Sequence, residues 1–323
     1  MQKTLRFVDA HLPWFVLAVV VLGLGFPGLF FTLNVFLTFF MAFMTFASTL
    51  GSSWRDLLGS FRRPVPVAVT LLLLHVLMPV FTLVLGRLLF PEAPLFTTGL
   101  VLEYTIPTAV TSLMWVGICH ADMPTAISIV LLDTLLSPLV IPVTLKMLLG
   151  STVELDALGM LQDLLWMVAL PAVLAMGLYQ IKPEAARALK PRLTPFSRLA
   201  MFGLIAANAA SCAPFLKEVN VTLAKVMAAV FLLCVLGFVF GYWVGKLLKL
   251  EYPTQFTVCF CTGMRNISAG AVLAAQYFPP EVLFPVAFSP VFWQITASVI
   301  AKVVQRLHRG ATGHPEGRSG EGA

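Results

Sequence analysis

Two polar interruptions in apolar sequence decide the fold of this chain. Residues 101–113 have the sequence VLEYTIPTAVTSL, and residues 258–270 have the sequence VCFCTGMRNISAG. Pro107 and Gly263 interrupt what would otherwise be continuous apolar helices, and an apolar segment with a Ser-Pro pair follows each break, at 137–138 and 289–290. Unwound backbone at membrane depth is tolerated only where it lies inside protein or lines a water-filled cavity. The two stretches therefore predict a pair of broken membrane helices around a binding site.

The rest of the chain has the composition of a membrane protein. Of its 323 residues, 59% are hydrophobic and 11% are charged, whereas soluble domains are about 45–50% apolar and roughly 25% charged. The net charge of +6 does not indicate nucleic-acid binding, because Lys and Arg occur in short clusters between apolar runs, as they do in cytoplasmic loops. We therefore predict an all-α polytopic protein that lies in a lipid bilayer.

Ten apolar segments are long enough to cross a membrane, which takes about 20 residues each. They span residues 12–31, 33–51, 65–89, 96–118, 123–149, 158–180, 196–215, 221–248, 253–277 and 282–306. Most of the 21 Lys and Arg residues fall on one side of these segments if the N-terminus is cytoplasmic. The sequence therefore predicts a multi-pass protein of a bacterial inner or plasma membrane, with both termini cytoplasmic.

The spacing of the breaks predicts an internal repeat. Pro107 and Gly263 lie 156 residues apart, and the two Ser-Pro pairs lie 152 residues apart. The repeats would cover residues 10–150 and 155–306, and the second would be inverted because each holds five helices. Inverted repeats with discontinuous helices are typical of secondary transporters. We predict one transmembrane domain over residues 1–306, followed by a polar, Gly-rich tail at 307–323 that is disordered.

Ionisable side chains within the predicted spans are the first functional candidates, since insertion of a central charge costs about 2.5 kcal/mol or more. Arg265 lies in the second break, Glu103 precedes the first, Asp133 lies one turn before Ser137, and His75 belongs to the third span. Arg265 could receive a carboxylate or sulfonate through its bidentate fork. Glu103 or Asp133 could accept a proton or pair with Arg265 in the empty site. A purely structural Arg–carboxylate pair and an interhelical hydrogen bond from His75 remain open alternatives.

Neutral polar residues at the breaks could also bind an ion or ligand; these are Thr108, Thr111, Ser112, Asn266 and Ser268. The alternative for each hydroxyl is a hydrogen bond to its own helix backbone. Enzyme signatures such as His-Glu-x-x-His, a phosphate-binding loop and Gly-x-Ser-x-Gly are absent from the sequence. The five cysteines lack the spacing of zinc ligands. We predict neither an enzyme nor a soluble cofactor.

At the two breaks the sequence resembles the bile acid:sodium symporter family, and the likeness covers most of residues 10–306. The family motif Pro-Gly-Gly-Thr-Ala-Ser-Asn is similar to Pro107-Thr-Ala-Val-Thr-Ser-Leu113, and Phe-Glu-x-Gly-x-Gln-Asn is similar to Phe260-Cys-Thr-Gly-Met-Arg-Asn266. The family Asp and Ser-Pro of the fifth helix match Asp122 and Ser137-Pro138. The resemblance implies a panel domain and a core domain, with the broken helices crossing in the core.

The chain departs from the family at the positions that members use for sodium. By the resemblance, those positions hold Cys261, Arg265, Leu113, Ala126 and Val130, and only Ser112 retains its oxygen. Sodium needs several oxygen ligands, which a thiol, a guanidinium and aliphatic side chains cannot supply. The sequence thus predicts that Arg265 replaces a sodium charge, and that Glu103 or Asp133 permits coupling to H⁺ instead of Na⁺.

The predicted function is secondary active transport of a small or amphipathic organic anion by alternating access. Two alternatives remain open. Related arsenite exporters use a membrane thiol, and Cys261 lies at the predicted crossing, so metalloid efflux is one alternative. A membrane sensor that kept the fold after losing its ion sites, and that binds a ligand without moving it, is the other.

Overall fold

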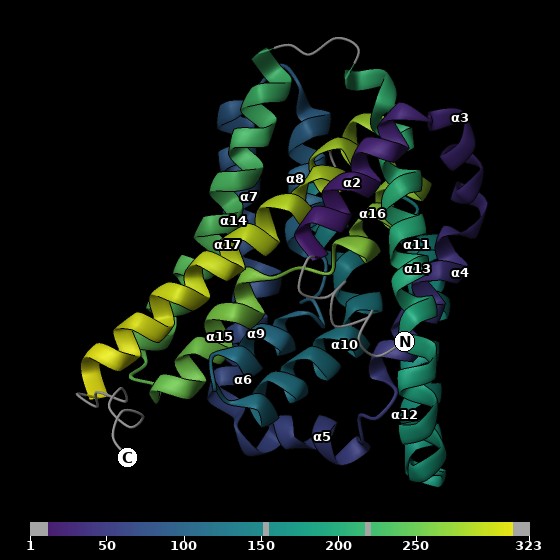
Figure 1. The fold of residues 1–323 in the computed structure, drawn as a ribbon. Coiled ribbons are helices and arrows are strands. Elements are labelled where there is room, and N and C mark those ends of the chain that lie inside the picture. The colour runs from purple at the N-terminus through teal and green to yellow at the C-terminus, as the bar shows by residue number, and fades with distance from the viewer. Residues whose placement is uncertain (1–11, 151–154, 217–220, 313–323) are drawn as a thin grey trace, which may run out of the picture.

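The computed structural model describes residues 12–150, 155–216 and 221–312 (Figure 1). All regular elements in these residues are helices, and a single isolated β-bridge joins Thr108 to Arg265. Seven of the described helices are long and apolar enough to cross a membrane: Pro27–Thr49, Pro64–Leu89, Met123–Leu149, Ala157–Ile181, Pro183–Pro214, Val221–Leu247 and Pro280–Val303. The chain is therefore an all-helical polytopic membrane protein, as the composition predicts.

We describe the helices as two groups, which also contact each other. The panel group contains α2 (Leu12–Gly25), α3 (Pro27–Phe30), η1 (Phe31–Phe36), α4 (Leu37–Thr49), α11 (Ala157–Leu164), η4 (Leu165–Ala169), α12 (Leu170–Ile181) and α13 (Pro183–Leu216), and in it α13 packs against α2 and α4. The core group contains α6 (Pro64–Leu72), η3 (Leu73–Leu77), α7 (Met78–Leu89), α8 (Pro94–Thr105), α9 (Ser112–Ile118), α10 (Met123–Leu149), α14 (Val221–Leu247), α15 (Tyr252–Gly263), α16 (Ile267–Tyr277) and α17 (Pro280–Thr312). The short α5 (Trp54–Leu58) and η2 (Gly59–Arg62) connect the first part of the panel group to the core group.

Proline shapes the helices of the core group. A proline leaves the carbonyl four residues earlier without its helical hydrogen bond. In both Ser-Pro pairs the serine hydroxyl bonds this part of the helix: Ser137 Oγ donates to the Thr134 carbonyl at 2.8 Å, and Ser289 Oγ donates to the Val286 carbonyl at 2.8 Å. The two pairs therefore have the same local structure, in which a side chain satisfies the carbonyl that the following proline cannot.

A third proline places His75 in an irregular turn. Pro79 removes the amide that would bond the His75 carbonyl in an α-helix, and residues Leu73–Leu77 form a π-helical turn, η3, immediately before α7. π-bulges inside α-helices occur frequently at functional sites. A second π turn, η4, precedes Pro171 in the panel group. Sequence analysis predicted the span around His75 but not this bulge.

Three boundaries differ from the predicted spans. The first span ends at Gly25 rather than residue 31, because Phe26 and Pro27 interrupt it before α3. The seventh begins at Pro183 rather than 196, since Pro191 and Pro195 lie inside a continuous α13 instead of ending it. Helix α17 continues to Thr312 and so includes residues 307–312, which sequence analysis assigned to the tail; residues 313–323 lie outside the described residues.

Candidate functional site

The two breaks cross in the core group and satisfy each other's backbone. The Ala109 amide donates to the Met264 carbonyl at 3.2 Å, and the Asn266 amide donates to the Pro107 carbonyl at 2.8 Å. These bonds flank the bridge between Thr108 and Arg265. Buried backbone groups outside helices need such partners. Asn266 also caps α16, because its Oδ1 accepts from the Ala269 amide at 3.4 Å.

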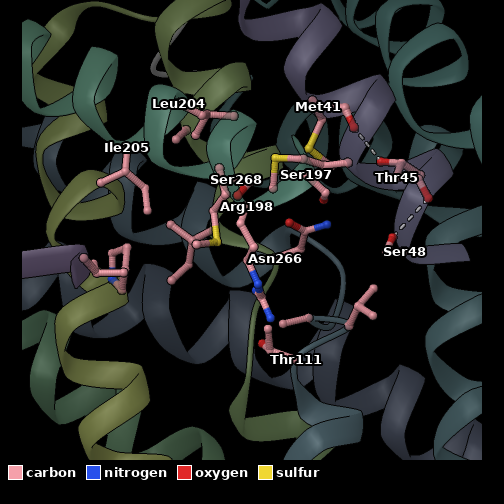
Figure 2. A pocket seen from close by; sticks show the side chains of 18 of the residues that line it. Met41, Thr45, Ser48, Thr111, Ser197, Arg198, Leu204, Ile205, Asn266 and Ser268 are labelled. Atoms are coloured by element: carbon pink, nitrogen blue, oxygen red, sulfur yellow. Dashed lines mark hydrogen bonds between the residues drawn. The ribbon is translucent and has the colours of Figure 1, made fainter. Parts of the chain in front are cut away.

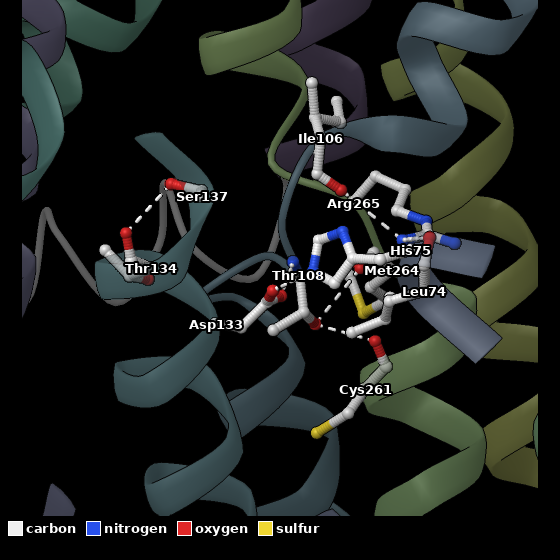
Figure 3. A network of polar contacts seen from close by, with 10 residues as sticks. All are labelled: Leu74, His75, Ile106, Thr108, Asp133, Thr134, Ser137, Cys261, Met264 and Arg265. Atoms are coloured by element: carbon white, nitrogen blue, oxygen red, sulfur yellow. Dashed lines mark hydrogen bonds and ion pairs between the residues drawn. The ribbon is translucent and has the colours of Figure 1, made fainter. Parts of the chain in front are cut away.

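Behind the crossing, Asp133 of α10 joins three segments of the core group (Figure 3). Its Oδ2 accepts from the Thr108 amide at 2.6 Å, and its Oδ1 lies 2.5 Å from His75 Nε2. The Thr108 hydroxyl donates to the carbonyls of Cys261, at 2.7 Å, and Met264, at 3.2 Å. Asp133 and Thr108 are fully buried, and His75 is 8% exposed. A continuous set of short polar contacts therefore links η3, α10, the first break and the end of α15.

Arg265 is 2% exposed and uses its guanidinium inside the core group. Its Nη1 donates to the Leu74 carbonyl at 3.4 Å and to the Ile106 carbonyl at 3.3 Å, and the group lies 5.4 Å from the centre of the Tyr104 ring. Within the described part of the chain the ion pairs are Arg63–Asp122 and His75–Asp133. Arg265 therefore forms no direct ion pair with Glu103 or Asp133 among the described residues, although the sequence allows one. Asp133 is bonded to His75 and Thr108 instead.

Glu103 lies at the end of α8 that leads into the first break, and it is fully buried. The Ser289 hydroxyl and the Arg265 guanidinium are its polar neighbours, but its carboxyl oxygens form no hydrogen bond of standard geometry to the described residues. The same holds for the Tyr104 hydroxyl and the Trp293 indole nitrogen. Polar groups thus gather between α8 and α17, and among the described residues no side-chain hydrogen bond connects Glu103 to either break.

A cavity of about 400 Å³ lies in front of the crossing, between the panel group and the core group (Figure 2). Its walls come from α4, α13, both breaks, α16 and α17. The polar residues that line it are Thr45, Ser48, Thr111, Lys190, Thr194, Ser197, Arg198, Asn208, Arg265, Asn266, Ser268 and Gln294. The three ionisable residues of the lining, Lys190, Arg198 and Arg265, are all basic. The cavity therefore has the charge character of an anion site.

The structure divides the predicted site residues between the two sides of the crossing. Thr111, Arg265, Asn266 and Ser268 line the cavity. The other predicted residues lie in the interior of the core group, away from the cavity lining: Glu103, Asp133, Thr108, Ser112, Cys261 and His75. The crossing brings Thr108, Asp133 and His75 into one network, which sequence spacing did not show.

Sequence analysis missed the contribution of α13. The predicted seventh span included Arg198 but gave it no role, whereas its side chain enters the cavity and points toward Thr111, beside Asn266 (Figure 2). The cavity-facing residues of α13 recur at helical spacing: Lys190, Thr194, Ser197, Arg198, Met201, Leu204, Ile205 and Asn208. This period was the available signal. It was hidden because the predicted span began only at residue 196.

Cys261 lies outside the cavity lining and is fully buried. Its sulfur lies 3.9 Å from the Ser112 hydroxyl. All five cysteines are free, and no group of three or more His, Cys, Asp or Glu side chains among the described residues could hold a metal ion. The thiol at the crossing therefore belongs to no three-ligand metal site in the part of the chain that the structure describes.

Comparisons with known proteins agree with this architecture. The model of the Sodium Bile acid symporter family matches residues 38–219. The chain is 37% identical over 267 residues to the uncharacterized protein YbaS of Bacillus subtilis (strain 168), covering 82% of this chain and 87% of that protein. It is 22% identical over 303 residues to the uncharacterized sodium-dependent transporter YocS of the same organism, covering 93% and 92%. It is 25% identical over 305 residues to the probable chloroplastic sodium/metabolite cotransporter BASS3 of Oryza sativa subsp. japonica, covering 91% and 70%.

Proposed function

Because the chain belongs to the sodium bile acid symporter family, we propose that it transports a small or amphipathic organic anion through the cavity in front of the crossing. The family is one of symporters, and YocS and BASS3 carry transporter names, so the chain is a membrane transporter and not an enzyme. The substrate enters between the panel group and the core group and contacts both breaks. Transport then proceeds by alternating access, as the two groups move relative to each other.

The charge of the cavity lining carries this proposal. Among the described residues, three basic side chains and no Asp or Glu line a space of about 400 Å³, which is within the roughly 300–1,000 Å³ range of small-molecule sites. An Arg fork binds carboxylate or sulfonate in two parallel hydrogen bonds. Methionines at 41, 44, 114, 201 and 264 supply adaptable apolar surface beside these cations. An anion with an apolar body matches both features.

The proposal includes ten membrane helices in two inverted five-helix repeats, with both termini in the cytoplasm of a bacterium. Two observations support it. Each broken helix is followed by a helix with a Ser-Pro pair, and the two serines make the same hydrogen bond to the carbonyl three residues earlier. The breaks also pair with each other across the bridge. Discontinuous helices at matching positions are the expected location of a transporter site.

The residues at the family's sodium positions do not fit a sodium ion. Cys261, Ala126 and Val130 are buried and offer no side-chain oxygen, and Arg265 carries a positive charge of its own. The nearest polar partner that the Ser112 hydroxyl has among them is the Cys261 sulfur, at 3.9 Å. A hard cation needs oxygen ligands, and a guanidinium at the site repels it. We therefore propose that Arg265 supplies the charge that sodium provides in relatives, and that a proton drives transport.

The metalloid alternative gains nothing from this geometry, because the Cys261 thiol is buried outside the cavity. Measurement of flux distinguishes the sensor alternative from a transporter. A sensor would bind an anion tightly and move none, whereas a transporter exchanges bound for external anion.

The proposal is tested with purified protein in sodium-free choline buffer. A panel of carboxylates and sulfonates with apolar bodies is screened for a rise in melting temperature, since a ligand that binds the native state stabilises it. Amines of matched size are the control. Anions that stabilise are then measured for counterflow in proteoliposomes. We expect stabilisation by anions but not amines, and saturable counterflow. Stabilisation without any counterflow would support the sensor, and stabilisation by amines alone would contradict an anion site.

A further inference from the structure

The His75–Asp133 pair is a second polar site that the substrate cavity does not use. Its two members come from the π turn η3 and from α10, and their nearest atoms are 2.5 Å apart. Ionisable groups at membrane depth are costly and mark ion or proton pathways. His is also the side chain whose charge changes most readily between about pH 5 and 8. The pair therefore has the composition of a proton site.

We propose that the His75–Asp133 pair binds the proton that couples transport, a proposal that rests on the transport function proposed above. The position for this proton is His75 Nδ1, which is buried and has no hydrogen-bond partner among the described residues. In the unloaded pair, neutral His75 donates from Nε2 to the Asp133 carboxylate. Loading adds one proton at Nδ1, so the net charge of the pair changes from −1 to 0.

The pair is connected to the substrate cavity by a chain of hydrogen bonds. Asp133 accepts from the Thr108 amide with its other oxygen, and the Thr108 hydroxyl donates to the Met264 carbonyl. Met264 and its neighbour Arg265 line the cavity. A change in the charge of the pair therefore changes the hydrogen bond that holds the first break, and through it the second break. This connection gives the proton a route to influence the substrate site without contacting the substrate.

The charged surroundings of the pair are defined by the elements that pack against η3 and α10. Arg265 donates to the Leu74 carbonyl, next to His75, and interacts electrostatically with Asp133. Cys261 of α15 interacts electrostatically with Asp133, and Glu103 and Tyr104 belong to α8, which also packs on η3. Arg265 is thus a fixed positive charge beside the pair. The proton on His75 is the positive charge that can arrive and leave, which is the role of the sodium ion in a sodium symporter.

Glu103 is the other buried carboxyl that could hold a proton, but the geometry favours the pair. Outside α8 and the second break, Ser289 on α17 is a polar neighbour of Glu103, and the carboxyl oxygens of Glu103 form no hydrogen bond of standard geometry to the backbone of either break among the described residues. Asp133 holds the first break directly at 2.6 Å. Coupling requires that the proton site and the substrate site share a structural element that both can bias. Thr108 is that element for the pair.

The test needs no substrate. The chain has five His and six Trp residues, so protein with ¹³Cε1-histidine and 5-fluorotryptophan gives few resonances. His75→Gln and Trp293→Phe assign the two that matter, because Trp293 lines the cavity. We expect the His75 and Trp293 resonances of the wild-type protein to change with pH at one shared midpoint. The Trp293 change should disappear in His75→Gln. A His75 resonance that is constant between about pH 5 and 8.5 would overturn the proposal, as would a Trp293 change that persists in His75→Gln.

A second variant keeps the test decisive if His75→Gln does not fold. Asp133→Asn retains the size of the side chain and removes its charge, so we expect the Trp293 change to disappear in this variant even where the His75 resonance still changes with pH. A Trp293 change that still follows the His75 resonance in Asp133→Asn would overturn the proposed route through Asp133. His120→Gln is the matched control for loss of an imidazole, since His120 lies in the loop after α9 and should leave the Trp293 change intact.

Transport then separates failure of this inference from failure of the proposed function. If no anion shows counterflow, the transport function is wrong, while the resonances still report whether the pair binds a proton. If an anion is transported, a proton gradient in sodium-free buffer should drive its accumulation in the wild-type protein. His75→Gln should abolish accumulation and retain counterflow, because exchange needs no net proton movement. Accumulation that survives in His75→Gln would show that the coupling proton binds elsewhere.

Discussion

The two breaks occupy matching places in the core group but contribute different chemistry. The first, between Thr105 and Ser112, presents a neutral Thr108 whose amide is bonded to Asp133. The second, between Gly263 and Ile267, presents Arg265, whose guanidinium is bonded to backbone carbonyls and which lines the cavity. One break is therefore attached to the proposed proton site, and the other carries the charge of the proposed anion site. The bridge between Thr108 and Arg265 makes them one unit.

The difference between the breaks bears on how a member of a sodium symporter family works with a permanent positive charge, Arg265, in its core. A bound sodium ion arrives and leaves, whereas a guanidinium stays, so Arg265 alone cannot couple transport to a gradient. A second group must change its charge during the cycle. Three kinds of change should therefore differ in the size of their effects. They are substitutions in the second break, substitutions on the panel-group side of the cavity, and replacement of the ions in solution.

Removal of the charge at the second break should have the largest effect. Arg265→Gln removes the bidentate fork proposed to bind the anion, two charge-assisted hydrogen bonds that together contribute roughly 3 kcal/mol, so we expect anion uptake at low substrate concentration to fall about 100-fold. Arg265→Lys is the matched variant, since it keeps the charge without the planar fork, and it should restore uptake only in part. Initial rates in proteoliposomes measure both. Sodium-dependent uptake that Arg265→Gln leaves unchanged would contradict the role of Arg265 as the replacement charge.

The second break should also depend on its glycine. A Cβ added at Gly263 would lie 2.3 Å from the Phe238 ring, which is buried in α14 against Phe260. We expect Gly263→Ala to reduce the free energy of unfolding by about 1–3 kcal/mol through overpacking. Gly177→Ala in α12 is the control, because no neighbouring atom lies within 4 Å of the place that its methyl group would take, and it should change stability by about 1 kcal/mol or less. Equal melting temperatures for the two variants would show that α14 can move away from the crossing.

Sequence patterns located the membrane helices and the breaks because those features depend on local chemistry. Apolar length identifies a span, and Pro107 and Gly263 lie among polar residues that mark the two interruptions. The tertiary partners could not be found in this way. His75 and Asp133 lie 58 residues apart in the sequence, and the partners of Arg265 are main-chain carbonyls, which every residue carries. Charge alone favoured an ion pair between Arg265 and a carboxylate. In the structure, Asp133 pairs with His75 instead.

Arg198 is a second residue whose place in the site could not be predicted from the sequence. Basic residues near a span end are normally placed in loops by the rule that predicts orientation, and Arg198 lies two residues inside the predicted seventh span. Only the continuation of α13 back to Pro183 reveals the face that carries it into the cavity. The rule describes where cations are retained on average, and it does not separate a solvent-facing Arg from one that turns inward.

Arg198 offers a smaller test, on the panel side of the cavity. If the anion contacts both helix groups, Arg198→Gln should weaken its apparent affinity about tenfold, since one charge-assisted hydrogen bond contributes roughly 1.5 kcal/mol or more. Because Arg198 is only half-buried, Arg198→Gln should change the melting temperature without substrate by less than Arg265→Gln does. Arg87→Gln, an exposed charge at the end of α7 outside the cavity, is the control. Unchanged affinity in Arg198→Gln would place the anion on the core side alone.

Sodium itself should have the smallest effect. At equal ionic strength, replacement of choline by Na⁺ should leave the melting temperature of the ligand-free protein unchanged, because buried Cys261, Ala126 and Val130 supply no oxygen and Arg265 repels a cation. A rise in melting temperature with Na⁺ would mean that backbone carbonyls at the breaks form the ion site without those side chains. The Ile106 carbonyl is the one to examine then, because Arg265 occupies it in this structure. A sodium response that increases in Arg265→Gln would show that the guanidinium and the sodium ion compete for one position. The crossing of the two breaks would then hold either the fixed charge of Arg265 or a bound sodium ion.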